Sequence, residues 1–503
     1  MFKILLFCCF LVFINSSTMD QLIFVSLHSR HGARAPLEVD KNKKDFLGEY
    51  WTNPGELTPA GHRMEYVLGL RNRQRYINIF GFLSQKYDPH EILVYSTNVN
   101  RTILSIASQL QGLYPMYNKS GEYLTKEQIK VSKPPINVDY DVINKEIENI
   151  KNSSLPNYMT IIPIHTRSVS ERIMNVQDSN GCNEVVNRTR EFNKLNNELV
   201  VDETKKFNEK YSQTLNSYFN NPDDFKYDFN YISLFCDTVV CDDSDGRTME
   251  DFIKKTNLDK DELVEDCKNA IVINFREDFF GDKKNDVILL GVSTKMKELL
   301  YFMKLKIDED MNNKDNEETN KNVADYTKPK MVIYSGQDST LTPEELFMIK
   351  YFGKKDQNFI YPTYTTQLAF EVTRDKEKPK DLDYTSYKVT FYVNDDEFVV
   401  TDFQTFKDTI EKTVWSDKQV SEYCEDEVKT EEDGKNEDDV KTEDGKSDSN
   451  SKMQLYALIG VGCLAFIFII IIICLCVKLH NMDKKESSSP GNEGLMNENE
   501  NEI

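Results

Sequence analysis

Two arginines flank one histidine near the start of the chain, with Arg30 and Arg34 on either side of His31. The planar guanidinium group of arginine suits paired contacts with phosphate oxygens, and imidazole is a nitrogen nucleophile near neutral or mildly acidic pH. Gly32 lets the backbone approach a ligand closely. These residue types favour phosphoryl chemistry. A short basic segment after a strand can equally be a solvated loop, so the segment alone does not decide.

Polar loops that could complete such a site follow three apolar segments, at residues 22–27, 91–96 and 331–334. The first segment leads into the basic loop, the second leads to Arg101, and the third leads to Gln337 and Asp338. In an open α/β sheet, ligands bind at the carboxyl ends of the strands. If the three loops converge there, they form a cationic cradle around a nucleophile and a carboxyl group.

Helical patterns follow these loops. Thr58 and Pro59 are typical of an N-cap and a first helical position, and residues 103–113 have helical apolar spacing. A capping box with proline predicts a helix start at Thr342. The first helix is expected to bury four apolar residues and to expose four arginines, namely Met64, Val67, Leu68 and Leu70, and Arg63, Arg71, Arg73 and Arg75. Residues 367–373 predict a strand, and residues 387–401 predict a hairpin.

Composition limits the class of protein. The chain has 503 residues, of which 39% are hydrophobic, enough for one large or two smaller folded units. Its net charge of -22 argues against nucleic acid or an anionic membrane surface as the main partner. Phosphate is not excluded, because distant surface charge is screened and a buried arginine cluster acts locally.

The two ends of the chain predict a single-pass membrane protein. Residues 1–17 have the pattern of a secretory signal peptide, and residues 454–477 are apolar over a length that can cross a bilayer. Lysines follow the span, so residues 478–503 are expected in the cytosol and the rest outside it, in a type I topology. Residues 413–453 are acidic and poor in apolar residues, which predicts a disordered stalk.

The lumenal part retains five cysteines, so complete internal pairing is impossible: Cys182, Cys236, Cys241, Cys267 and Cys424. A local bridge between Cys236 and Cys241 is conceivable, and a metal site there is the weaker interpretation because no histidine is near. Glycosylation sequons begin at Asn100, Asn118, Asn152 and Asn187. Asn100 is expected to be unmodified, since a glycan there would obstruct the proposed site.

The middle of the chain differs in composition from the flanking parts. Residues 121–330 are rich in Asn, Lys, Asp and Glu with apolar residues at helical spacing, which predicts a mostly helical insertion. A flexible loop is expected near 308–330. The α/β core is then made by residues 18–120 and 331–412.

Four motifs in this order resemble the histidine acid phosphatase family, which includes the lysosomal and prostatic acid phosphatases. They are Arg30-His31-Gly32-Ala33-Arg34-Ala35-Pro36, Leu57-Thr58-Pro59-Ala60-Gly61, Ser96-Thr97-Asn98-Val99-Asn100-Arg101-Thr102 with Gly112-Leu113-Tyr114-Pro115, and Tyr334-Ser335-Gly336-Gln337-Asp338-Ser339-Thr340-Leu341. The resemblance covers roughly residues 21–401 and is thin in the middle. It implies an α/β sandwich domain with a smaller, mostly helical domain inserted.

The resemblance also implies a mechanism for hydrolysing phosphate monoesters without a metal or another cofactor. His31 would be the nucleophile that forms a phosphohistidine, and Asp338 would be the proton donor. The phosphoryl oxygens would be bound by Arg30, Arg34 and Arg101, together with Gln337.

Gln337 departs from the family pattern, which has histidine before the aspartate. The amide can donate a hydrogen bond but carries no charge. Two hypotheses follow: a membrane-anchored acid phosphatase of the lysosome or plasma membrane, or an impaired pseudophosphatase that binds a phosphorylated ligand or acts as a surface receptor. The sequence does not identify the substrate, and it leaves a homodimer open.

Overall fold

The computed structural model describes residues 20–37, 51, 53–116, 124–132, 148–167, 198–219, 222, 225–247, 258–280, 286–312, 328–354, 357–374 and 383–425. Within these ranges, no helix is long and apolar enough to cross a bilayer. The expected signal peptide at 1–17 and the expected membrane span at 454–477 lie outside the described residues.

The described strands form one mixed sheet of seven in the order β3-β2-β4-β1-β5-β6-β7. They are β1 (Gln21–Arg30), β2 (Ile92–Thr97), β3 (His165–Arg167), β4 (Met331–Gly336), β5 (Gln367–Arg374), β6 (Tyr387–Val393) and β7 (Asp396–Asp402). Neighbouring strands from β3 to β1 are parallel, and those from β1 to β7 are antiparallel. The strands predicted at 91–96, 331–334 and 367–373 and the predicted hairpin are confirmed.

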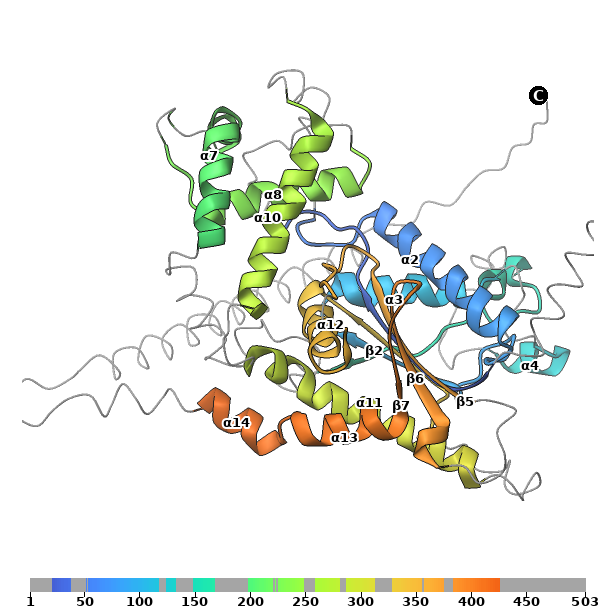
Figure 1. Ribbon diagram of the computed structural model, residues 1–503. Helices are drawn as coiled ribbons and strands as arrows, with labels where there is room; N and C mark the ends of the chain where they lie inside the picture. The colour runs from blue at the N-terminus through green and yellow to red at the C-terminus, as the bar shows by residue number, and fades with distance from the viewer. Residues whose placement is uncertain are drawn as a thin grey trace, which may run out of the picture. The chain divides into compact units, whose positions relative to one another are not determined.

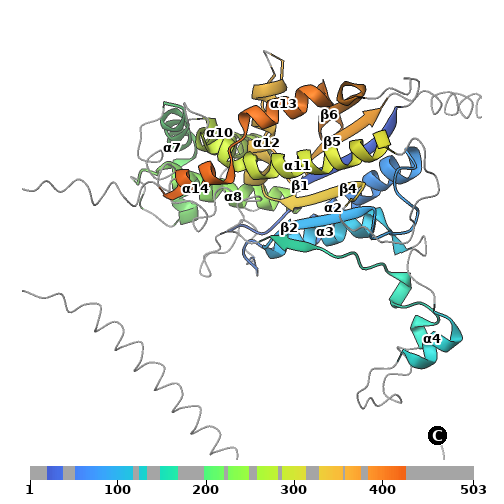
Figure 2. The same ribbon diagram turned by 90° about the horizontal axis from the view of Figure 1, so that it is seen from below.

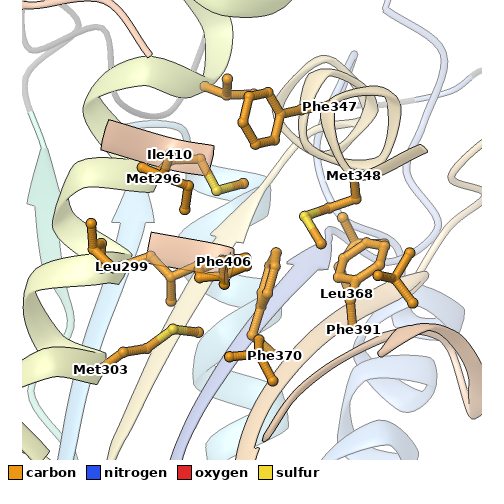
Figure 3. Close-up of a cluster of buried hydrophobic side chains, with 14 of the residues drawn as sticks. Met296, Leu299, Met303, Phe347, Met348, Leu368, Phe370, Phe391, Phe406 and Ile410 are labelled. Carbon is orange, nitrogen blue, oxygen red and sulfur yellow. The ribbon is translucent and has the colours of Figure 1, made fainter. Parts of the chain in front are cut away.

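Helices cover both faces of the sheet (Figures 1 and 2). One face packs against the π-helix η1 (Arg73–Ile79) and α3 (Asn100–Leu113), and α2 (Pro59–Asn72) packs on α3. The other packs against α11 (Asp286–Asn312), α12 (Asp338–Phe352) and α13 (Phe403–Thr413). Figure 3 shows part of this second core, where Met296 and Met303 of α11 lie on the side of Phe406 and Phe370, and Met348 of α12 lies beside Phe391. The observed layers agree with the expected α/β sandwich.

A β-bulge in β1 distributes its apolar residues between the two cores. The pairing register with β5 shifts between Leu22 and Phe24. As a result, Ile23 and Phe24 both pack with the α11 side, whereas Val25 and Leu27 pack with the α3 side. After the bulge, alternation resumes and carries the strand to Arg30 at its carboxyl end.

The N-terminus of α2 is confirmed, since the Thr58 hydroxyl accepts a hydrogen bond from the Gly61 N–H at 3.1 Å. The predicted buried face is wrong. Gly61, Glu65, Gly69 and Asn72 are the buried residues, whereas Val67 is 53% exposed and Met64, Leu68 and Leu70 are half-buried. A Cβ on Gly69 would lie 1.9 Å from the Gln109 carbonyl oxygen, so the helices α2 and α3 pack backbone to backbone through small residues.

Two arginines expected on a solvated face of this helix are engaged in the fold. Arg73 is buried and donates to the Leu113 carbonyl at 2.9 Å. Arg75 forms a two-pronged ion pair with Glu371 of β5, with distances of 2.6 and 2.7 Å. They lie in η1, where the backbone changes from the α to the π pattern and turns these side chains toward α3 and the sheet.

The boundaries of three other elements also correct the sequence interpretation. Helix α12 begins at Asp338 rather than Thr342, because the Thr340 hydroxyl accepts the Gln337 N–H at 3.0 Å and closes the first turn. Helix α11 continues to Asn312, so the start of the loop expected at 308–330 is helical. The segment expected to be a disordered stalk contains a helix, α14 (Asp417–Glu425). Val420 of this helix and Trp415 just before it pack on the core.

The helices α7 (Glu198–Phe219), α8 (Phe229–Ser244) and α10 (Lys260–Phe280) share a separate apolar cluster. Cys236, Cys241 and Cys267 are free and buried, which contradicts the local bridge considered for the first two. Five positions apart on one helix, Cys236 and Cys241 point in different directions. Cys424 is disulfide-bonded. The shorter elements are α4 (Lys126–Val131), η3 (Pro156–Tyr158) and η5 (Tyr384–Ser386).

A buried charged triad joins β1, α11 and α12. The Glu344 carboxylate contacts both His28 Nδ1 and Lys295 Nζ, and all three side chains are buried. Burial lowers the pKa of His28 to about 4, against the opposing effect of Glu344. With His28 neutral, Glu344 and Lys295 compensate each other, and removing either of these two would leave an uncompensated charge in the core. The triad fixes α12, which carries Asp338, to β1, the strand that ends just before His31.

Candidate active site

The predicted site residues from three loops do meet at the carboxyl ends of adjacent parallel strands. In the pairing register, Arg30 at the end of β1 lies opposite Gly336 at the end of β4, and Ser335 lies opposite Ser96 at the end of β2. Arg101 follows in the first turn of α3, and Asp338 opens α12. The sheet topology therefore brings the basic loop, Arg101 and the Gln337–Asp338 pair to one edge.

His31 is buried and has a defined tautomer. Its Nδ1 lies 2.8 Å from the Gly32 carbonyl oxygen. A carbonyl oxygen can only accept, so Nδ1 carries the proton and the neutral ring keeps the Nε2 lone pair available. Burial, together with the charges of Arg30, Arg101 and Arg34, holds the pKa of His31 well below its usual value. The ring therefore remains unprotonated in mildly acidic solution.

Arg30 is held between an acidic group and an aromatic loop. Its Nη2 lies 2.8 Å from Asp338 Oδ2, and its Nη1 donates to the Pro362 carbonyl at 2.7 Å. The Arg30 Cζ atom lies 4.5 Å from the centroid of the Tyr364 ring. The Tyr361 hydroxyl donates to Asp338 Oδ2 at 2.9 Å. Asp338 is thus fixed beside the arginine cluster in the free protein.

Arg34 is paired with a residue of the helical cluster. Its guanidinium contacts both oxygens of Asp237 in α8, at 2.8 and 3.2 Å. Its Nη1 also lies 3.5 Å from the Cys241 thiol, and that thiol lies 3.3 Å from the Tyr364 hydroxyl. Burial and Asp237 raise the pKa of Cys241 to about 12, so the thiol is uncharged.

Arg101 and Gln337 complete the cluster with fewer contacts. Arg101 has one weak contact, to the Gly55 carbonyl oxygen at 3.5 Å, and its Nε is buried without a partner among the described residues. Burial and the positive charges of Arg34 and Arg30 lower the pKa of Arg101. The Gln337 amide Nε2 donates to the Thr97 hydroxyl at 3.2 Å.

The second motif, at residues 57–61, supports the basic loop at residues 30–36 rather than contributing a polar group to the site. A Cβ on Gly32 would lie 2.5 Å from the Gly61 carbonyl oxygen, and one on Gly61 would lie 2.1 Å from the Ala33 carbonyl oxygen. The Thr58 N–H donates to the Ala33 carbonyl at 2.9 Å. Glycine is therefore required at both positions, and the N-terminus of α2 determines the conformation of the loop.

Several residues of the site were not predicted from the sequence. Asp237 and Cys241 lie in a segment whose composition gives only a helical pattern, and their partner Arg34 is about two hundred positions away. Tyr361, Pro362 and Tyr364 form a loop that has no helical or strand periodicity. A run of tyrosines with a proline just before β5 is the sequence feature that could have pointed to this loop. Within the described ranges, no group of three or more acidic, histidine or cysteine side chains is placed to hold a metal ion.

Residues 21–394 match the family model of the histidine phosphatase superfamily, branch 2. The chain belongs to this superfamily. Its acid phosphatase relatives include a lysosomal acid phosphatase from Xenopus laevis, 40% identical over 98 residues, which are 19% of this chain and 21% of that protein. Human lysosomal acid phosphatase is 37% identical over 106 residues, 21% of this chain and 24% of that protein. The aligned stretches thus span about a fifth to a quarter of these relatives.

Among solved structures, a phytase from Citrobacter braakii is similar with a TM-score of 0.47 and 13% sequence identity. The similarity covers 79% of this chain and 98% of the phytase.

Proposed function

We propose that this histidine phosphatase is a membrane-anchored acid phosphatase that hydrolyses phosphate monoesters through a phosphohistidine on His31. The observation that supports this most is a buried histidine with a free Nε2 lone pair inside a cluster of three arginines. The anchor is the apolar segment 454–477, with the catalytic part in the lumen of the secretory pathway or at the cell surface.

The arginines supply the charge that phosphoryl transfer requires. Arg30, Arg34 and Arg101 would bind the phosphoryl oxygens, and the fixed guanidinium groups stabilise their charge with little reorganisation. His31 Nε2 attacks phosphorus, and the bond to the leaving alcohol oxygen breaks. Asp338 would enter this step as the carboxylic acid and give its proton to that oxygen. A water molecule would then attack the phosphohistidine, its proton would pass to the Asp338 carboxylate, and phosphate would leave with the His31 Nε2 lone pair restored.

Gln337 supports a second candidate function, a pseudophosphatase that binds a phosphorylated ligand without turnover. The side chain is buried and donates to Thr97, so a neutral amide occupies a position in the phosphate cradle. The arginines could retain a phosphate group even if the transition state were poorly stabilised. His31 and Asp338 are both retained, and this favours the enzyme.

Hydrolysis of an aryl phosphate by the purified full-length chain in detergent micelles tests the proposal. We expect saturable release of phosphate at acidic pH. Because the pKa of His31 is lowered, the neutral ring persists below the usual histidine pKa, and kcat/KM should fall on the acidic side only at the lowered value. Activity that fell off around the ordinary histidine pKa as the pH dropped would contradict this role of His31. Phosphate binding by calorimetry without any turnover would favour the pseudophosphatase.

A further inference from the structure

The guanidinium of Arg34 is occupied by a carboxylate in the free protein. Asp237 Oδ1 lies 2.8 Å from Nη2, and Oδ2 lies 3.2 Å from Nη1. The same Oδ2 accepts the Leu37 N–H at 2.9 Å, which fixes the carboxylate over the loop. The side chain of Arg34 is 7% exposed and that of Asp237 is 21% exposed. A largely enclosed pair of this kind is screened much less than one on the surface.

Asp237 differs from the neighbouring carboxylates of α8. Asp242 accepts the indole N–H of Trp51 at 2.9 Å, and Asp243 pairs with Lys260 at 3.0 Å. Asp237 instead reaches a residue of the phosphate cradle. Cys241, one turn later, contacts Tyr364 and Arg34, so this turn of α8 covers the basic loop. The carboxylate is therefore built into the site rather than placed on a solvated helix face.

This pair reduces the positive charge that the cradle offers to a ligand. With Arg34 neutralised, Arg30 and Arg101 remain, and Arg30 is itself paired with Asp338. A single phosphoryl group needs few cationic partners, whereas a ligand with several phosphoryl groups brings additional charge close to the Asp237 carboxylate. Like charges at short distance in a poorly hydrated site repel strongly.

We infer that Asp237 is a specificity-determining residue, which restricts the site to singly phosphorylated ligands of low charge and disfavours polyphosphorylated ones. This inference rests on the proposed function, because it takes the arginine cluster as the phosphate cradle. It concerns the free energy of anion binding and does not require turnover.

Calorimetric binding of two inorganic probes to the full-length chain tests the inference. Phosphate represents a single phosphoryl group, and pyrophosphate adds a second. We expect Asp237→Asn to tighten phosphate binding about threefold and pyrophosphate binding about tenfold, because removing the carboxylate leaves Arg34 charged and unpaired. The selectivity for the larger anion should therefore increase.

Asp243→Asn is the matched control, since it removes the same charge from the same helix without touching Arg34. It should leave both affinities within about twofold, because the Asp243 carboxylate pairs with Lys260 and Lys268 rather than with Arg34. Equal tightening in both variants would overturn the inference and indicate a general charge effect. Unchanged or weaker binding in Asp237→Asn would also overturn it, and would make Asp237 a support for Arg34. If the chain hydrolyses an aryl phosphate but Asp237→Asn does not change the selectivity between the two anions, the inference fails and the proposed function stands. If neither anion binds to the parent chain or to either variant, the inference and the proposed function both fail.

Discussion

Replacing His31 by alanine is expected to lower kcat for an aryl phosphate by at least about 10³-fold, because the covalent route then loses its nucleophile. The two histidines nearest to it in the sequence, His28 and His62, are engaged elsewhere. His28 is held by Glu344 in the core, and His62 contacts Ser108 at 2.7 Å on the helix surface. Steady-state kinetics at acidic pH measures the effect.

The control for this variant is phosphate binding. The three arginines remain in His31→Ala, so inorganic phosphate should still bind with an affinity close to that of the parent chain. A loss of binding would mean that the loop has rearranged, and the kinetic result could not then be attributed to the nucleophile. Residual kcat within about tenfold of the parent, with binding intact, would contradict a phosphohistidine mechanism.

Replacing Gln337 by histidine is expected to raise kcat by about 10²-fold. An imidazolium at this position would add a charge-assisted donor to the phosphoryl group in place of a neutral amide. Gln337 is buried at the N-terminus of α12, beside Thr97 and Thr340, so the new ring would be directed by the same backbone. The gain should appear mainly in kcat, since the contact strengthens as charge develops in the transition state.

Gln337→Met is the matched variant, because methionine has a similar length and cannot donate a hydrogen bond. The expected order of kcat is Gln337→His first, the parent chain second and Gln337→Met last. Equal rates in all three would show that position 337 does not contact the phosphoryl group. A fall in the rate of Gln337→His would instead show that the surrounding residues are adapted to the amide.

The position of Arg30, His31, Arg101 and Asp338 could be predicted from the sequence because these residues end an apolar strand or lie in the loop or helix start that follows one. The parallel pairing of β1, β4 and β2 then places Arg30, Arg101 and Asp338 at one edge. Apolar strands and the loops after them are local features. Local pattern indicated which loops could meet at one edge, and the resemblance to the histidine acid phosphatase family supplied the expectation that they do.

Features that depend on distant partners could not be predicted in the same way. The buried face of α2 is set by the close approach of Gly69 to α3, whereas an apolar pattern pointed to Val67. Helix α14 is acidic, yet Trp415 and Val420 attach it to the core. Asp237 and Tyr364 reach the site from a helical region and a loop that carry no chemical signature. Tertiary contacts decided each of these cases.

The central proposal is that phosphate passes through His31, and trapping the intermediate tests it most directly. The full-length chain is mixed with an aryl phosphate at acidic pH and quenched within the first turnovers in alkaline denaturant, because phosphoramidates are labile in acid. Peptide mass spectrometry then locates the added phosphoryl group. The mechanism predicts one phosphoryl group on His31 and none in His31→Ala. Turnover of the substrate with an unmodified His31, or with the phosphoryl group on another residue, would contradict it.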